Sequence, residues 1–196
     1  DEMILAGKSV GTTVGIGSHG IALPPIVKFG TPEQQERFVR PTLAGRKVSA
    51  LAITEPGGGS DVASLQTKAV RDGDHYVVDG SKTFITSGTR ADFVVAAVRT
   101  GGPGHGGVSL LVIEAGTPGF GVSKKLKKTG WWASDTAELT FENCRVPASN
   151  LVGIENAGFV AIMMNFTSER LYLAAQCVAI SELAYRESIR YGRERQ

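Results

Sequence analysis

The spacing of apolar positions changes twice along the chain and divides it into three zones. Residues 1–45 carry apolar side chains at helical spacing, whereas residues 47–147 break into short β-forming runs separated by glycine-rich turns. Beyond Gly153 a helical pattern continues through Tyr191. This order predicts an α+β fold, in which an antiparallel β-barrel or a sandwich forms a middle domain flanked by helical segments.

Within the first zone, the clearest helix start lies at Thr31. Thr is a favoured N-cap residue, Pro32 suits the first helical position, and Gln34 has the spacing of a capping box. We therefore expect a helix that begins here and ends near Gly45. Its expected buried stripe consists of Phe38, Val39 and Leu43.

In the middle zone, the turn at 72–74 separates two β-forming runs and predicts a hairpin. The glycine-rich stretch 100–107 has the composition of a flexible hairpin tip. In the last zone, apolar residues surround the predicted helix on nearly every side, which favours burial in a helical bundle or at a subunit contact. The expected strands span 47–54, 67–71, 76–78, 82–86, 93–99, 108–114 and 138–146.

Composition limits the classes of function. The chain has 196 residues, 42% apolar and 20% charged, with a net charge of +2. This profile is typical of a globular protein of one or two domains and gives no electrostatic signal for nucleic acid or a membrane surface. No apolar run reaches membrane-spanning length, and the two cysteines are far apart, as expected in a reducing compartment. The basic run 124–128 favours a solvated surface, with attraction of a phosphorylated substrate as the alternative.

The glycine triplet 57–59, followed by Ser60, is the most informative local feature. Ordering three glycines is costly, so such a loop often serves a close backbone approach, for instance to a phosphate. An ordinary glycine-rich turn is the alternative. The spacing matches neither a P-loop nor the dinucleotide fingerprint, and no GxSxG elbow occurs. The three histidines are isolated, so we predict no metal site.

Several motifs follow one another along the chain: Ile53–Ala63 (ITEPGGGSDVA), Asp79–Gly88 (DGSKTFITSG), Gly130–Pro147, Asn150–Gly153, Glu169–Leu171 and the final Tyr191–Gln196. In this order they resemble the acyl-CoA dehydrogenase family. The resemblance covers nearly the whole chain. It implies the end of an N-terminal helical domain (1–46), a middle β-barrel that binds flavin and acyl-CoA (47–150), and the first helix of a truncated C-terminal bundle (151–196). The chain would then be a piece of a longer protein.

The resemblance implies FAD as the cofactor, held by two strands and a turn. Leu51, Ile53 and Thr54 match a strand that contacts the isoalloxazine ring, and Gly59 and Ser60 match a turn beside the pyrophosphate. The segment Phe84, Ile85 and Thr86 matches residues packed against the ring near N5, although simple burial is the alternative for Phe84 and Ile85. The family often has Trp at position 84 and an aromatic residue at position 51. Arg195 and Gln196 match positions that reach the flavin of a neighbouring subunit.

The implied reaction is α,β-desaturation of an acyl-CoA thioester. A carboxylate removes the α-proton while the β-hydrogen leaves as hydride to flavin N5. Glu169 matches the base of a minority of members, those similar to isovaleryl- and long-chain-specific enzymes. Most members carry the base further along, beyond this chain, and Glu169 would then be a helical ion-pair partner. Thr167 and Arg170, with Ser60, match substrate-binding positions, and a structural ion pair is the alternative for Arg170.

Further expectations concern partners and competing functions. The resemblance implies an acyl-CoA substrate, an electron-transfer flavoprotein as acceptor, and a homotetramer or homodimer in the cytoplasm of a bacterium or in the mitochondrial matrix. A flavin-dependent oxidase or monooxygenase on the same scaffold is one alternative, and a non-catalytic binding or assembly module is another. The stretch alone is expected to be inactive and to hold flavin weakly or not at all, because much of the C-terminal wall of the site would lie outside it.

Overall fold

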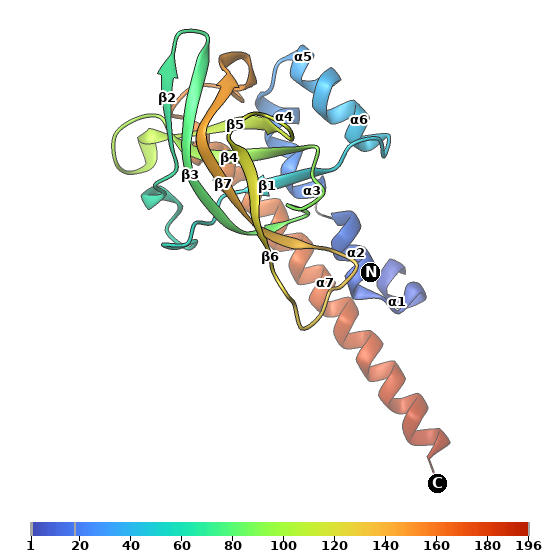
Figure 1. Cartoon of the computed structure of the whole chain (residues 1–196). Helices are drawn as coiled ribbons and strands as arrows, with labels where there is room; N and C mark the ends of the chain where they lie inside the picture. Colours follow the sequence, from blue (N-terminus) through green and yellow to red (C-terminus); the bar gives the residue numbers. More distant parts are fainter. Residues whose placement is uncertain (1, 18, 196) are drawn as a thin grey trace.

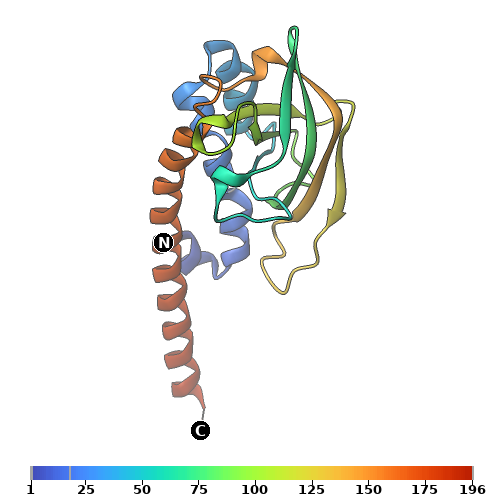
Figure 2. The same ribbon diagram turned by 90° about the vertical axis from the view of Figure 1, so that its left-hand side faces the viewer.

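The computed structural model describes residues 2–17 and 19–195. It contains a strongly curled β-sheet, a half-barrel, with short helices packed on one side and one long helix running away from it (Figures 1 and 2). The predicted α+β fold with a β-rich middle flanked by helices is confirmed. The helices are α1 (Glu2–Gly7), α2 (Val10–Gly17), α3 (His19–Ala22), α4 (Pro24–Phe29), α5 (Pro32–Gln34), η1 (Gln35–Val39), α6 (Arg40–Leu43), η2 (Val62–Ser64), η3 (His105–Gly107), η4 (Ala148–Asn150) and α7 (Gly158–Glu194).

The sheet combines four antiparallel pairs with two parallel ones. Its main path runs β1-β4-β2-β3-β7-β6, and β5 pairs with β4. The β2–β3, β3–β7, β4–β5 and β6–β7 pairs are antiparallel, whereas β1 lies parallel to β4 and β2 meets β4 in parallel at a single position. The strands are β1 (Ser49–Ala52), β2 (Lys68–Asp72), β3 (His75–Thr86), β4 (Phe93–Arg99), β5 (Val108–Glu114), β6 (Phe120–Lys125) and β7 (Thr136–Pro147).

Strand β4 separates two apolar cores, because successive side chains of a strand point to opposite faces. Phe93, Val95 and Ala97 face a core shared with the helices, and the alternate residues face a second core inside the curled sheet. This two-sided burial explains the unbroken apolar run of the strand. The second core holds Val94, Ala96 and Val98 together with residues of β1, β3, β5 and β7.

The predicted capping box is present at Thr31. The Thr31 hydroxyl accepts from the backbone N–H of Gln34, and the Gln34 side chain accepts from the Thr31 N–H, each at 3.2 Å. Phe38 is buried as expected, but Leu43 is 74% exposed, so its predicted burial is wrong. A π-helical turn at η1 rotates the positions that follow it and moves Leu43 away from the core.

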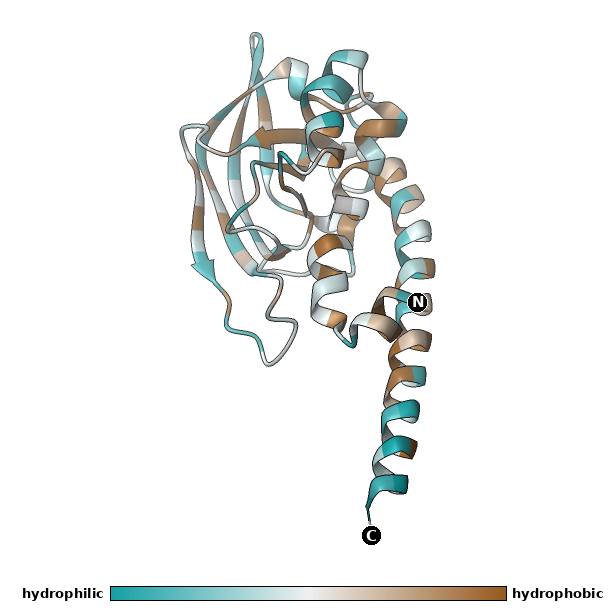
Figure 3. Cartoon of the chain, turned by 90° about the vertical axis from the view of Figure 1, so that its right-hand side faces the viewer, coloured by the Kyte–Doolittle hydropathy of each residue, from teal (hydrophilic) through white to brown (hydrophobic). Residues whose placement is uncertain are grey.

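The long helix α7 begins and ends close to the predicted bounds. Its buried residues lie between Gly158 and Ala179, the helix packs against α4, β5 and, nearer its middle, α1, and its end projects beyond the sheet (Figure 1). Figure 3 shows brown, apolar residues along the middle of this helix and teal, polar residues toward its C-terminal end. Within this chain, apolar residues such as Leu171 and Val178 are therefore exposed.

The loop at 100–107, expected to be flexible, is tied to its surroundings. The Arg99 guanidinium donates to the carbonyls of Gly102 and Gly104 on one side and of Ala63 and Leu65 on the other. The short helix η3 follows within the loop. Hydrogen bonds thus fix a glycine-rich segment that composition alone would leave mobile.

We expect Gln34→Ala to lower the free energy of unfolding by about 2–4 kcal/mol, because two backbone carbonyls would lose their buried donor. The Gln34 side chain is buried, and its Nε2 donates to the carbonyls of Ser149 (2.7 Å) and Leu151 (2.8 Å), joining the helices to the segment after β7. Urea unfolding measures the change. Gln35→Ala is the control, since Gln35 is only partly buried and makes one solvent-exposed bond of 3.2 Å to the Val27 carbonyl. Equal losses in both variants would contradict the prediction.

Candidate functional site

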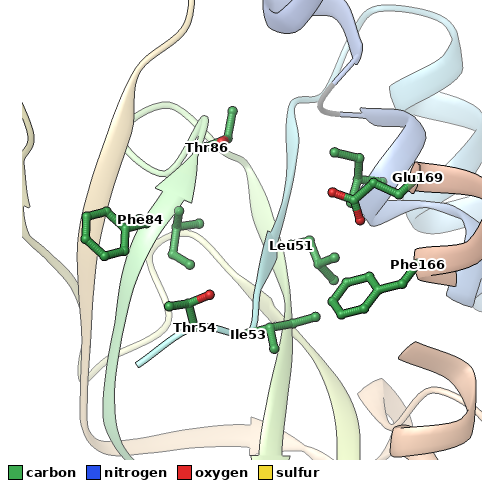
Figure 4. A pocket seen from close by; sticks show the side chains of 9 residues that line it. Leu51, Ile53, Thr54, Phe84, Thr86, Phe166 and Glu169 are labelled. Carbon is green, nitrogen blue, oxygen red and sulfur yellow. The ribbon is translucent and has the colours of Figure 1, made fainter. Parts of the chain in front are cut away.

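A cavity of about 190 Å³ lies where β1 and β3 approach the first half of α7. Figure 4 shows Leu51 and Ile53 in its middle, with Thr54, Phe84 and Thr86 to one side and the α7 residues to the other. Seven residues predicted for the site meet here. The full lining is Ile21, Leu51, Ile53, Thr54, Phe84, Ile85, Thr86, Phe166 and Glu169.

The two strand segments that line the cavity are held to each other directly. The N–H of Thr83, in β3, donates to the carbonyl of Thr54 at 2.9 Å, just beyond the end of β1. The residues on either side of this bond, Ile53 and Phe84, both line the cavity. One backbone hydrogen bond therefore sets the spacing of this wall.

Phe84 has an unusual backbone. Its φ is +58°, in the left-handed region that residues other than glycine rarely occupy, and its side chain is 66% exposed. It lies at a register shift between Lys82 and Ile85, where β3 bulges against β7. Ile85 is buried, so simple burial accounts for Ile85 but not for Phe84. The bulge presents an aromatic ring at the cavity edge, and strained backbone of this kind is concentrated at functional sites.

The glycine triplet forms a closed turn beside this wall. Glu55 and Gly58 exchange two backbone hydrogen bonds of 3.0 Å, which close the turn. Gly59 packs against the Thr54 side chain so closely that a Cβ there would lie 2.8 Å from Thr54 Cγ2. Within the triplet, Gly59 is thus the position that needs glycine for a close approach to Thr54, since a Cβ at Gly57 or Gly58 would meet no atom within 4 Å. Ser60 is exposed and lies outside the cavity lining.

A buried ion pair lies behind the wall. Lys82 Nζ donates to Glu55 Oε1 at 2.8 Å and to the Ile53 carbonyl at 2.9 Å, and the Lys82 side chain is fully buried. The two Glu55 oxygens also accept from the backbone N–H groups of Gln66 (2.6 Å) and Thr67 (2.9 Å).

Opposing effects set the protonation of this pair. Burial lowers the pKa of Lys82 to about 8, against the opposite pull of the Glu55 charge. Burial alone would raise the pKa of Glu55, but Lys82 and the hydrogen bonds to Glu55 outweigh it and lower the pKa. The contact between Lys82 and Glu55 was not predicted from the sequence, because no local pattern links positions 27 residues apart.

Glu169 brings a carboxylate into the same cavity from α7. It is half-buried, and its Oε2 atom is buried without a hydrogen-bond partner in the described part of the chain. Burial raises the pKa of Glu169, and the neighbouring Arg170 opposes this only in part. Arg170 itself extends over the Phe166 ring, 5.8 Å from its centroid. A carboxyl group with a raised pKa in a cavity has the properties of a general base.

Comparison with known proteins agrees with this geometry. Residues 50–144 match the family model of the acyl-CoA dehydrogenase middle domain. The chain is 42% identical to the long-chain specific acyl-CoA dehydrogenase, mitochondrial, of Rattus norvegicus, over 94% of this chain and 44% of that protein. It also matches the crystal structure of a probable acyl-CoA dehydrogenase from Mycobacterium abscessus with a TM-score of 0.97 and 57% identity, over 99% of this chain and 52% of that one. The chain belongs to the acyl-CoA dehydrogenase family.

The chain thus spans about half the length of the acyl-CoA dehydrogenases that it matches. Similarity is not limited to proteins named dehydrogenases. A prolyl acyl carrier protein oxidase has a TM-score of 0.89 and 34% identity, over 95% of this chain and 50% of that one. The scaffold therefore also occurs in a protein described as an oxidase.

Some residues that the family resemblance singled out lie away from the cavity. Thr167 and Arg170 flank the Glu169 turn of α7 but are exposed, and Thr167 donates to the Met163 carbonyl. Arg195 follows the far end of α7, about 39 Å beyond Glu169 at 1.5 Å per residue, and so does not reach the cavity of its own chain. Gln196 lies outside the described residues.

Two lining residues were not predicted as acyl-CoA dehydrogenase site residues. Phe166 precedes Glu169 by three positions, which places both side chains on one face of a helix, so the sequence held a signal for it. Ile21 comes from the short helix α3, where no periodic pattern marks a facing side chain.

The described residues form neither a metal centre nor a membrane-spanning helix. Among residues 2–17 and 19–195, no three His, Cys, Asp or Glu side chains form a group that could hold a metal ion. Over the same residues, no helix has the combination of length and apolarity that crossing a membrane requires.

We expect Glu169→Gln to stabilise the fold at neutral pH. A carboxyl whose pKa is raised by folding adds stability below its unfolded pKa, near 4.5, and loses it as the pH rises through the folded pKa. The variant and the natural protein should therefore have similar melting temperatures near pH 4 and diverge at pH 7–8, where the variant melts higher. Glu182→Gln on the same helix is the control, because Glu182 is paired with Arg186 at the surface. A lower melting temperature for Glu169→Gln at pH 8 would refute this.

Proposed function

We propose that this chain forms the flavin- and substrate-binding part of an FAD-dependent acyl-CoA dehydrogenase that desaturates acyl-CoA thioesters between the α and β carbons. One observation carries the proposal: Glu169, with an unpartnered buried oxygen, shares a cavity with the hydroxyl and aromatic groups of Thr54, Phe84 and Thr86. Family membership supports the same reaction class.

The residues of the cavity fit a flavin ring. At about 190 Å³ the cavity is smaller than typical ligand pockets of roughly 300–1,000 Å³, so it suits one ring system rather than a whole dinucleotide. Leu51, Ile53 and Ile85 would supply apolar contact, Phe84 an aromatic face, and Thr54 and Thr86 hydroxyl groups. Gly59 and Ser60 would lie toward the pyrophosphate, and Arg195 and Gln196 would serve a neighbouring subunit. When bound, FAD supplies the acceptor for the hydride, at N5.

The chemistry assigned to this chain is removal of a proton. Glu169, in its ionised form, takes the α-proton on its carboxylate, and the electron pair left at the α-carbon forms the double bond as the β-hydrogen leaves as hydride. The substrate loses two hydrogens, one as a proton and one as a hydride. The apolar lining limits water around Glu169, and a raised pKa makes this carboxylate a stronger base than an exposed one.

The remaining assignments complete the proposal. Ser60, Thr167 and Arg170 contact the CoA part of the substrate. Residues 1–46, 47–150 and 151–196 belong to a helical domain, the β-domain and the first helix of a second helical domain. The full-length protein is a homotetramer or homodimer, its electrons pass to an electron-transfer flavoprotein, and it works in the bacterial cytoplasm or the mitochondrial matrix.

In the full-length protein, Glu169→Gln should reduce turnover about 10²- to 10⁴-fold, the contribution typical of a general base. With the natural protein, kcat/KM should rise with pH through one ionisation above 4.5, because only the ionised carboxyl accepts the proton. Steady-state assays with an artificial electron acceptor measure both.

Glu182→Gln should keep normal turnover, since Glu182 lies elsewhere on α7 and is paired with Arg186. Glu169→Gln should keep FAD and bind acyl-CoA. Near-normal turnover of Glu169→Gln would assign the base to a residue outside this chain.

An oxidase is the second candidate, favoured by the similarity to a prolyl acyl carrier protein oxidase. The two functions differ in the fate of the electrons after substrate reduces the flavin. For a dehydrogenase, we expect substrate-reduced protein to stay bleached in air for minutes and to reoxidise rapidly on addition of electron-transfer flavoprotein. Stopped-flow absorbance and a peroxide assay measure this, and fast reoxidation in air with stoichiometric peroxide would indicate the oxidase.

A further inference from the structure

The buried pair Glu55–Lys82 lies behind the cavity wall, where Lys82 Nζ bonds to the carbonyl of the lining residue Ile53. We propose that Lys82 is a positioning residue for the flavin site: through Glu55 and the Ile53 carbonyl, it fixes the segment after β1 against the bulge of β3. The inference rests on the proposed function. It adds a residue that acts on the cofactor through the backbone rather than by touching it.

The pair connects the two segments whose spacing defines the wall. Lys82 Nζ reaches the Ile53 carbonyl at 2.9 Å, and Ile53 and the next residue, Thr54, both line the cavity. One residue further along both segments, the Thr83 N–H donates to the Thr54 carbonyl. The side chain of Lys82 and the backbone of Thr83 therefore hold consecutive carbonyls, which fixes the orientation of the peptide units between them.

Glu55 fixes the position of the Lys82 amine from the opposite side. Its two oxygens accept from the N–H groups of Gln66 and Thr67, so the carboxylate is held by the loop that leads into β2. Close packing behind β3 reinforces this, because a Cβ at Gly80 would lie 2.8 Å from the Thr67 Cα. The amine thus has one location in which it satisfies both acceptors.

Stability alone does not account for a charged pair here. Apolar residues of similar volume often replace a buried ion pair without loss of stability. An apolar side chain at position 82 would fill the space but leave the Ile53 carbonyl without this donor. The Lys82 amine, unlike an apolar side chain, donates a directional hydrogen bond to the Ile53 carbonyl.

The bulge next to Lys82 requires such an anchor. Lys82 is the last paired residue before the register shift, and Phe84 follows in the left-handed region. Backbone strain of this kind persists only when the surroundings fix it from both sides. On the far side, the Gly88 N–H donates to the Ile85 carbonyl and the Ser87 N–H donates to the Asp135 carbonyl. On the near side, Lys82 and Thr83 hold the chain.

The test compares three variants of the full-length protein. Lys82→Met removes the amine and leaves Glu55 buried without its counter-charge. The double variant Glu55→Gln/Lys82→Met removes both charges and so should recover much of the lost stability, while the Ile53 carbonyl still lacks its donor. Gln34→Ala is the matched control, because it also removes a buried donor to backbone carbonyls, but Gln34 is not one of the cavity-lining residues. For each protein, FAD affinity, the visible flavin spectrum and the melting temperature of the apoprotein are measured.

We expect the double variant to melt above Lys82→Met, yet to bind FAD about 10- to 100-fold more weakly than the natural protein and with a shifted flavin spectrum. Gln34→Ala should lose stability but keep the natural affinity and spectrum. A double variant with natural affinity and spectrum would overturn the inference, as would a loss of affinity in Gln34→Ala equal to that in Lys82→Met. A natural protein that binds no FAD would instead contradict the proposed function itself.

Discussion

The bond network around the Lys82 amine is the constraint on which the rest of the site depends. Burying an ammonium group in a β-domain is costly, and the fold offsets that cost with the Glu55 carboxylate and the Ile53 carbonyl. Removing either partner would leave the other group buried and unsatisfied. The segment after β1 and the bulge of β3 can therefore move only together, although β1 and β3 are not paired in the sheet.

Glu169 represents the opposite solution for a buried charge. The structure leaves one of its oxygens buried without a partner and its pKa raised, where Glu55 is surrounded by donors. The two carboxyl groups have different surroundings and different properties as a result. Glu55 is ionised and its oxygens accept hydrogen bonds from three donors, which suits a structural role. Glu169 has a free oxygen that can accept a proton. Burying a carboxylate without a partner destabilises the fold, and such unfavourable local arrangements are typical of catalytic sites.

Sequence patterns predicted the elements that have a continuous signal. The apolar runs of β4 and β5, the hairpin at 72–74 and the length of α7 followed from local residues alone. Strand β6 (Phe120–Lys125) was missed because most of it is exposed and it ends in two lysines, so its apolar signal is short. Strand β3 was expected as two pieces, since its bulges at Gly80 and near Phe84 interrupt the period of two. Seven of the nine cavity residues came from the family resemblance. The left-handed backbone of Phe84 and the role of Lys82 depend on tertiary contacts that no local window contains.

The backbone at Phe84 limits which side chains can occupy that position during evolution. A left-handed φ disfavours β-branched residues most strongly, so valine or isoleucine there would oppose the bulge itself. Glycine would relieve the strain but remove the ring from the cavity edge. Exchange among unbranched aromatic side chains leaves the backbone unchanged and alters only the area that faces the cavity. At position 84 the backbone is therefore fixed by the bulge, whereas the aromatic side chain can vary. Selection can change the size of this one ring without altering the sheet.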